Sequence, residues 1–172
     1  RVKKLSAAKR ERFLSEKEVA ELLEVLKARE ARRELSDVHA DTIRLLLLTG
    51  ARRGEINDLE WAEVDFDNGV VKLPPARSKT GEKTIPLNAP AIAILKRRAL
   101  RNDGLAKRDR SRFVFPAPTN SKMSATGLPK AWGRVRIAAK LPGVRIHDLR
   151  HSFASFAVAK GASLALIAKV LG

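Results

Sequence analysis

The sequence predicts a mainly α-helical protein with one small antiparallel β-sheet, an α+β fold. Apolar residues recur at helical spacing on both sides of a central stretch. Between residues 64 and 87 the pattern changes to short β-prone runs that turn residues separate. The chain has 172 residues, enough for one domain with its own hydrophobic core.

We expect the folded part to open with a helix near residue 15. Ser15 followed by Glu18 has the spacing of a capping box, which marks a helix start. Residues 1–12 carry six basic residues and one acidic residue and are interpreted as a linker or arm, so we expect the chain to be part of a longer protein. A second helix is expected over roughly 37–49, ending at Gly50, a natural C-cap. The first helix should place four apolar side chains on one face: Val19, Leu22, Leu23 and Leu26.

The β-sheet is predicted by turn chemistry. After the string T-G-A-R-R-G-E, a short helix should run through Leu59. The run V-D-F-D-N-G-V-V-K-L then predicts a hairpin that turns at Asn68-Gly69. A third strand, K-T-I-P-L, follows the turn R-S-K-T-G-E-K. Pro86 lacks a backbone N–H, which limits this strand to a sheet edge or places the proline at a strand end.

Two further helices are expected after the sheet. The string A-P-A-I-A-I-L-K-R-R-A-L predicts an amphipathic helix ending in basic residues. Residues 101–112 are polar and basic and are interpreted as a mobile loop. The next helix covers about 128–141; it should turn Trp132, Val135 and Ala139 inward and Lys130, Arg134 and Lys140 outward.

The C-terminal part should also be helical. The string H-D-L-R-H-S-F-A-S-F-A-V-A-K predicts a helix whose buried side chains are Leu149, Phe153, Phe156 and Ala157. A last helix should begin with Ser163 as its N-cap and run to Leu171.

Charge is the most informative property of the composition. The chain has 35 Lys and Arg against 19 Asp and Glu, a net charge of +16. Residues 1–67 hold fifteen acidic and fourteen basic residues, whereas residues 68–172 hold four acidic and twenty-one basic ones. A field of one sign on this scale indicates a polyanionic partner, of which nucleic acid is the usual one. A ribosome-like or merely soluble basic surface is the alternative.

Composition also excludes several kinds of protein. The chain contains no cysteine, so disulfides, thiolate metal sites and cysteine nucleophiles are excluded. Its longest apolar run, L-L-L-L at residues 45–48, is too short to span a bilayer. We therefore expect a cytoplasmic protein.

The string H-D-L-R-H places His147 and His151 at i, i+4 spacing, as zinc ligands on a helix would be. However, the metalloprotease pattern has a glutamate where Asp148 stands, and the only other histidine, His39, is far away in sequence. No metal is expected. Taken alone, the string is equally compatible with a structural role in which His147 caps a helix and Arg150 is solvated.

A second basic cluster, T-G-A-R-R-G-E, places Arg52 between a helix end and the start of the next helix. Its guanidinium and the free backbone N–H groups of that helix could face one anion. Glu55, three residues on, lies on the same helical face and could orient the arginine. The alternative is a surface Arg–Glu pair. Lys79, in the turn between two strands, could deliver a proton or simply be solvated.

Together these strings resemble the tyrosine recombinase (phage integrase) family. The resemblance rests on Arg52 in T-G-A-R-R-G-E, Lys79 in S-K-T-G-E-K-T-I-P-L, and His147 and Arg150 in H-D-L-R-H-S-F-A-S; it covers residues 13–172. It implies a catalytic domain over residues 13–172, with residues 1–12 leading from a missing N-terminal DNA-binding domain. The string G-A-S-L-A-L-I-A-K-V-L-G resembles the helix that precedes the next catalytic residue of the family.

The resemblance implies DNA strand cleavage and rejoining without a cofactor. Arg52 and Arg150 are expected to clamp the scissile phosphate and Lys79 to act as general acid. His147 is expected to donate a hydrogen bond or to manage the proton of the nucleophile. Glu55 and His151 are expected to be supporting residues of this catalytic set. Expected contacts with double-stranded DNA are Arg53, Arg77, Lys122, Lys130 and Arg134.

One departure from the family is serious. The family's attacking residue is a tyrosine, and this sequence contains none. These 172 residues alone are therefore expected to be inactive and monomeric, with the nucleophile located beyond Gly172. The full-length protein would act as a tetramer on DNA. A type IB topoisomerase relative, a DNA-binding module without catalysis and an RNA-binding or ribosomal domain remain open alternatives.

Overall fold

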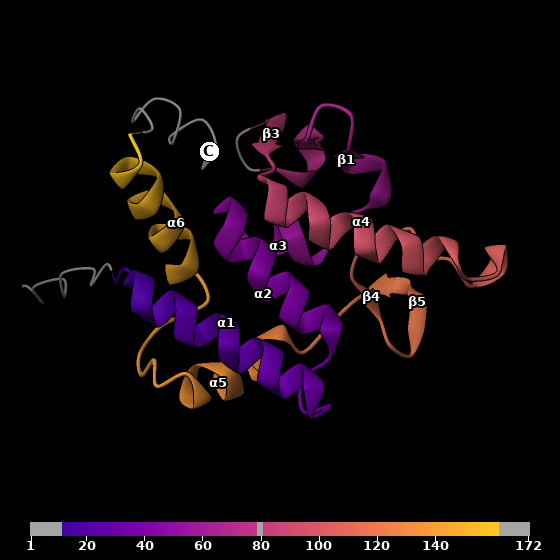
Figure 1. Ribbon diagram of the computed structural model, residues 1–172. Coiled ribbons are helices and arrows are strands. Elements are labelled where there is room, and N and C mark those ends of the chain that lie inside the picture. The colour runs from indigo at the N-terminus through magenta and orange to yellow at the C-terminus, as the bar shows by residue number, and fades with distance from the viewer. Residues whose placement is uncertain (1–11, 79–80, 162–172) are drawn as a thin grey trace, which may run out of the picture.

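The computed structural model describes residues 12–78 and 81–161 (Figure 1). The helices are α1 (Glu16–Ala31), α2 (Asp37–Thr49), α3 (Arg53–Asn57), α4 (Ala89–Asp103), α5 (Leu128–Ala138) and α6 (Asp148–Ala159). The strands are β1 (Val64–Asp65), β2 (Val70–Leu73), β3 (Lys83–Pro86), β4 (Pro116–Ala117) and β5 (Asn120–Ser124). Short 3₁₀ turns are η1 (Trp61–Glu63), η2 (Pro75–Arg77) and η3 (Lys107–Asp109). The helical class and the three predicted strands are confirmed.

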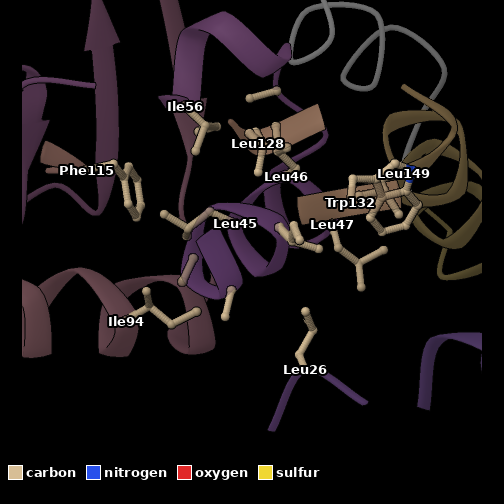
Figure 2. Close-up of a cluster of buried hydrophobic side chains, with 14 of the residues drawn as sticks. Leu26, Leu45, Leu46, Leu47, Ile56, Ile94, Phe115, Leu128, Trp132 and Leu149 are labelled. Atoms are coloured by element: carbon tan, nitrogen blue, oxygen red, sulfur yellow. The ribbon is translucent and has the colours of Figure 1, made fainter. Parts of the chain in front are cut away.

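Helix α2 lies at the centre and contacts α1, α3, α4, α5 and α6 (Figure 1). Three of its four consecutive leucines, Leu45, Leu46 and Leu47, are buried, which requires neighbours on more than one side. They meet side chains from several elements in the core shown in Figure 2, among them Ile56, Ile94, Phe115, Trp132 and Leu149. The helix begins at the N-cap Ser36 and ends at Gly50, whose φ of 63° favours glycine.

The three-stranded sheet has the order β1-β2-β3, and both pairs are antiparallel. The expected hairpin forms at Asn68-Gly69, where Gly69 has a φ of 63°. Strand β3 lies at the sheet edge and ends at Pro86, as the missing N–H requires. Lys83 and Ile85 on β3 are buried, and Thr84 between them is exposed.

Some local predictions were wrong. A second sheet, β4–β5, was not expected; its strands are short, and N-S-K-M-S has no apolar alternation to reveal it. Residues 101–103, expected in a loop, continue helix α4. Leu23 is 38% exposed, because α1 buries only the narrower stripe of Leu22 and Leu26.

Helix α6 also differs from its predicted burial. Leu149 is buried, but Phe153, Phe156 and Ala157 are only half-buried and line one wall of an open groove. Leu47 and Leu48 of α2 also line this groove. The predicted helix from Ser163 to Leu171 lies outside the described residues. Within the described residues, every helix is too short or too polar to cross a membrane.

Candidate active site

The loop between α2 and α3 positions Arg52. Arg52 is the N-cap residue of α3, with extended backbone angles (φ −71°, ψ 150°). Its backbone N–H donates to Glu55 Oε2 at 2.7 Å, and its guanidinium Nη1 donates to Glu55 Oε1 at 3.1 Å. One carboxylate therefore fixes the backbone and the side chain of Arg52 together, as predicted for Glu55. The backbone N–H of Arg52 itself bonds to Glu55, so it is not one of the donors expected to face an anion.

Glu55 is buried and also accepts from Lys83 of β3. The Lys83 ammonium lies 3.2 Å from Glu55 Oε1 and 3.0 Å from Glu55 Oε2, and both residues are only 4% exposed. Burial acts to raise the pKa of Glu55, but bonds from the Arg52 backbone and from Lys83 outweigh it and lower this pKa. Glu55 is therefore ionised at neutral pH.

The buried lysine was not foreseen in the sequence. Burial lowers the pKa of Lys83, and the nearby charges of Arg150 and Arg52 act in the same direction against the support from Glu55. A signal was available, because alternation in K-T-I-P-L places Lys83 on the same face as the buried Ile85. A charged residue on an inward face requires a partner, which here is Glu55.

Arg150 reaches the same place from the other end of the chain. It lies in the first turn of α6, which packs on α2, and its Nη1 donates to the carbonyl of Gly50 at 3.1 Å. This carbonyl belongs to the C-cap of α2, two residues before Arg52. The pKa of Arg150 is lowered by burial and then by the charge of Arg52, while Glu55 opposes the shift. The charges of Arg52 and Glu55 therefore act on the Arg150 guanidinium.

His147 lies at the start of α6 beside His151. Their rings meet edge to face with centroids 5.1 Å apart, and His147 makes no side-chain cap bond. His147 is exposed, and its pKa is lowered by partial desolvation, then by His151 and Arg150. Among the residues that the structure describes, no group of three or more His, Asp or Glu is arranged to hold a metal ion.

Asp148 caps the loop in front of α6, a role that the sequence interpretation missed. Its buried carboxylate accepts the backbone N–H of Arg145 at 2.8 Å and the Arg145 guanidinium at 2.8 Å. A carboxylate that bonds backwards to the chain fixes the entry angle of a helix. Asp148 therefore fixes the orientation of the first turn of α6, and with it the positions of His147 and Arg150.

Of the remaining predicted residues, Lys79 lies outside the described residues. Arg53, Lys122, Lys130 and Arg134 are exposed, and Arg53 lies beside the start of α5 in one shallow pocket. Arg77 is held by Glu63, with Nε and Nη2 at 3.0 and 3.2 Å from its carboxylate oxygens. DNA contact by these five residues stays a prediction.

The lowered pKa of His147 predicts a loss of stability in mild acid. An unfolded histidine takes up a proton near pH 6.5. Folded His147 resists protonation because partial burial removes its ring from water and because His151, Arg150 and Arg145 lie nearby, with Asp148 opposing. Its contribution is complete above about pH 6.5 and declines as the pH falls toward the lower folded value. Urea denaturation at about pH 7.5 and 5.5 should show a smaller decline in unfolding free energy for His147→Gln than for the unmodified chain. Equal declines would contradict this prediction.

The sequence profile of the phage integrase family matches residues 12–172. The putative integrase/recombinase y4rE of Sinorhizobium fredii is 31% identical over 147 residues, covering 83% of this chain and 47% of that protein. Tyrosine recombinase XerD of Pseudomonas aeruginosa is 32% identical over 136 residues, covering 76% of this chain and 44% of that protein. The chain thus spans about half the length of these relatives or less.

Solved structures show the same fold. The crystal structure of XerA recombinase matches with a TM-score of 0.72 at 20% identity, over 94% of this chain and 56% of that one. XerH site-specific recombinase bound to its difH substrate matches with a TM-score of 0.70 at 24% identity, over 93% of this chain and 46% of that one.

Proposed function

Because this chain belongs to the phage integrase family, we propose that it is the catalytic domain of a site-specific tyrosine recombinase that cleaves and rejoins double-stranded DNA. The observation that carries this proposal is the convergence of Arg52 and Arg150 at the end of α2. Arg150 bonds to the Gly50 carbonyl, two residues from Arg52, although the two arginines are about a hundred residues apart in sequence.

Two arginines suit the chemistry of a phosphodiester. Attack at phosphorus places negative charge on the non-bridging oxygens of a five-coordinate transition state. Guanidinium forks hold two oxygens at once and stay charged at any working pH, so Arg52 and Arg150 would stabilise this charge without a metal. His147, largely neutral at pH 7 because its pKa is lowered, would donate a hydrogen bond to the same phosphate or take the proton of the nucleophile.

The complete reaction also needs a nucleophile and an acid. A tyrosine oxygen would form a bond to phosphorus while the bond to the 5′-oxygen breaks, and Lys79 would give the leaving oxygen its proton. The resulting 3′-phosphotyrosyl bond keeps the energy of the broken bond, so no ATP is consumed. Since the 172 residues contain no tyrosine, we propose that a longer protein supplies it after Gly172 and works as a tetramer on DNA.

A suicide DNA substrate tests this proposal on the proposed longer protein, in which the chain continues past Gly172. A nick placed next to the cleavage site releases the short strand, so the covalent DNA–protein adduct accumulates. We expect an adduct that survives denaturation and disappears when the tyrosine after Gly172 is replaced by Phe. A protein that binds DNA but forms no adduct on any cognate site would instead be a DNA-binding module without catalysis.

DNA binding by the 172-residue chain should depend strongly on salt. Residues 68–172 carry twenty-one basic and four acidic residues, and each phosphate contact releases condensed counterions. With about three contacts, affinity should fall roughly 40-fold between 50 and 200 mM salt. Fluorescence anisotropy with a labelled duplex measures this change, and a flat affinity would contradict it.

Individual contacts can be separated with matched variants. Lys130 and Arg134 are exposed on α5, and Lys17 and Lys27 are exposed on α1 in the nearly neutral part of the chain. Replacing Lys130 and Arg134 together by Ala should reduce the slope of log affinity against log salt by about 2. The same change at Lys17 and Lys27 should leave the slope unaltered.

A further inference from the structure

A buried ion pair joins the sheet to the arginine loop. Lys83 on β3 and Glu55 on α3 are 28 residues apart, and the ammonium lies within 3.2 Å of both carboxylate oxygens. Each oxygen of Glu55 also accepts from Arg52: Oε1 from the guanidinium and Oε2 from the backbone N–H. The carboxylate is therefore bonded on both oxygens by both residues, which fixes its position and rotation.

Stability alone does not explain a lysine at this position. Lys83 is 4% exposed and lies on the face of β3 that also buries Ile85. Apolar side chains in place of both Lys83 and Glu55 would avoid the cost of removing two charges from water, and such replacements of whole buried ion pairs are often neutral or stabilising. The ammonium therefore acts on its partners in a way that an apolar side chain could not.

The charges indicate what that action is. Glu55 bonds to Arg52 and Lys83, and its negative charge also acts on Arg150. If Lys83 were absent, the full charge of Glu55 would fall on Arg52 and weaken the pull of Arg52 on an anion. With Lys83 present, the carboxylate is neutralised by the lysine, so Arg52 keeps its hydrogen bonds to Glu55 while its positive charge remains effective toward a phosphate.

We propose that Lys83 is a positioning residue, which holds and neutralises Glu55 so that Arg52 is fixed and electrostatically available for the scissile phosphate. This inference rests on the proposed function, because it assigns Arg52 to the clamp. Lys83 acts through Glu55 and does not itself touch the phosphate. It is distinct from the expected general acid, Lys79, four residues earlier in the chain.

The test uses the longer protein and single-turnover cleavage of the suicide substrate. Lys83→Met should lower the cleavage rate about 10- to 100-fold, because an arginine displaced by a fraction of an ångström loses transition-state contacts. DNA affinity should change less than about threefold, since the buried Lys83 makes no phosphate contact of its own. Lys83→Arg, which can still bond both carboxylate oxygens, should recover most of the rate. Lys72→Met, on the neighbouring strand and 55% exposed, is the matched control and should cleave normally.

A double variant distinguishes positioning from a general structural role. If Lys83 acts through Arg52, then Lys83→Met in an Arg52→Ala background should lower the rate by less than about threefold further. Full multiplication of the two effects, or normal cleavage by Lys83→Met, would overturn the proposal. If Lys83→Met does not fold by circular dichroism, Lys83→Gln takes its place with the same expectations. Absence of an adduct from the unmodified protein, or normal cleavage by Arg52→Ala, would instead overturn the proposed function.

Discussion

Arg150→Ala is expected to lower the single-turnover rate of DNA cleavage by about 100-fold or more in the longer protein. The loss arises because preorganised charge at the non-bridging oxygens is removed, and the low local dielectric of a half-buried guanidinium makes that charge effective. Arg52→Ala should have an effect of the same size. Arg150→Lys should recover little activity, because an ammonium cannot reproduce a two-pronged contact. Quenched-flow cleavage of the suicide substrate at saturating protein measures the rates.

The control for Arg150→Ala must distinguish a slower chemical step from a loss of folded protein. Arg150 also bonds to the Gly50 carbonyl, so its removal changes the contact between α6 and α2. Thermal unfolding should therefore be measured for each variant, and rates compared at a temperature where all are folded. Arg101→Ala, an exposed arginine on α4 paired with Asp37, is the matched variant and should cleave normally. Near-normal cleavage by folded Arg52→Ala or Arg150→Ala would refute the phosphate clamp.

Sequence spacing was informative where two partners lie within one helical turn, as Arg52 and Glu55 do. The expectation that Arg52 acts together with His147 and Arg150 came from the family resemblance and not from spacing. Lys83 and Asp148 were missed because their roles depend on burial. Whether an inward lysine meets a carboxylate from another element is decided by how β3 packs beside α3, which no local pattern contains.

The same distinction holds for the fold. Ser15 with Glu18, Gly50 and Asn68-Gly69 were predictable because capping boxes, C-caps and tight turns are set by local backbone chemistry. Strands β4 and β5 have no such signal, since a short polar hairpin is stabilised by its neighbours. The half-burial of Phe153 and Phe156 was also unpredictable, because periodicity shows which face is apolar but not what covers it.

Asp41→Ala is expected to reduce the free energy of unfolding by about 3–5 kcal/mol, the largest effect on stability that we anticipate. Asp41 of α2 is fully buried and accepts from Arg44 at 3.0 Å, Arg97 at 2.6 Å and Arg98 at 3.1 Å. Arg98 of α4 is only 7% exposed, so removal of this carboxylate leaves a buried guanidinium with much less compensation. Urea denaturation of the 172-residue chain measures the change.

Asp37→Ala provides the matched control, because Asp37 also pairs with Arg98 at 3.2 Å but is 44% exposed. Its replacement should cost about 1 kcal/mol or less, as expected for a solvated ion pair. Equal, small effects of the two substitutions would contradict the assignment of Asp41 as the residue that anchors α4 on α2.

This anchor also matters for the active site. Helix α2 ends at Gly50, whose carbonyl accepts a hydrogen bond from Arg150, and Arg52 follows two residues later. A shift of α2 relative to the core would therefore displace both arginines, so Asp41→Ala should also slow cleavage under conditions where it remains folded.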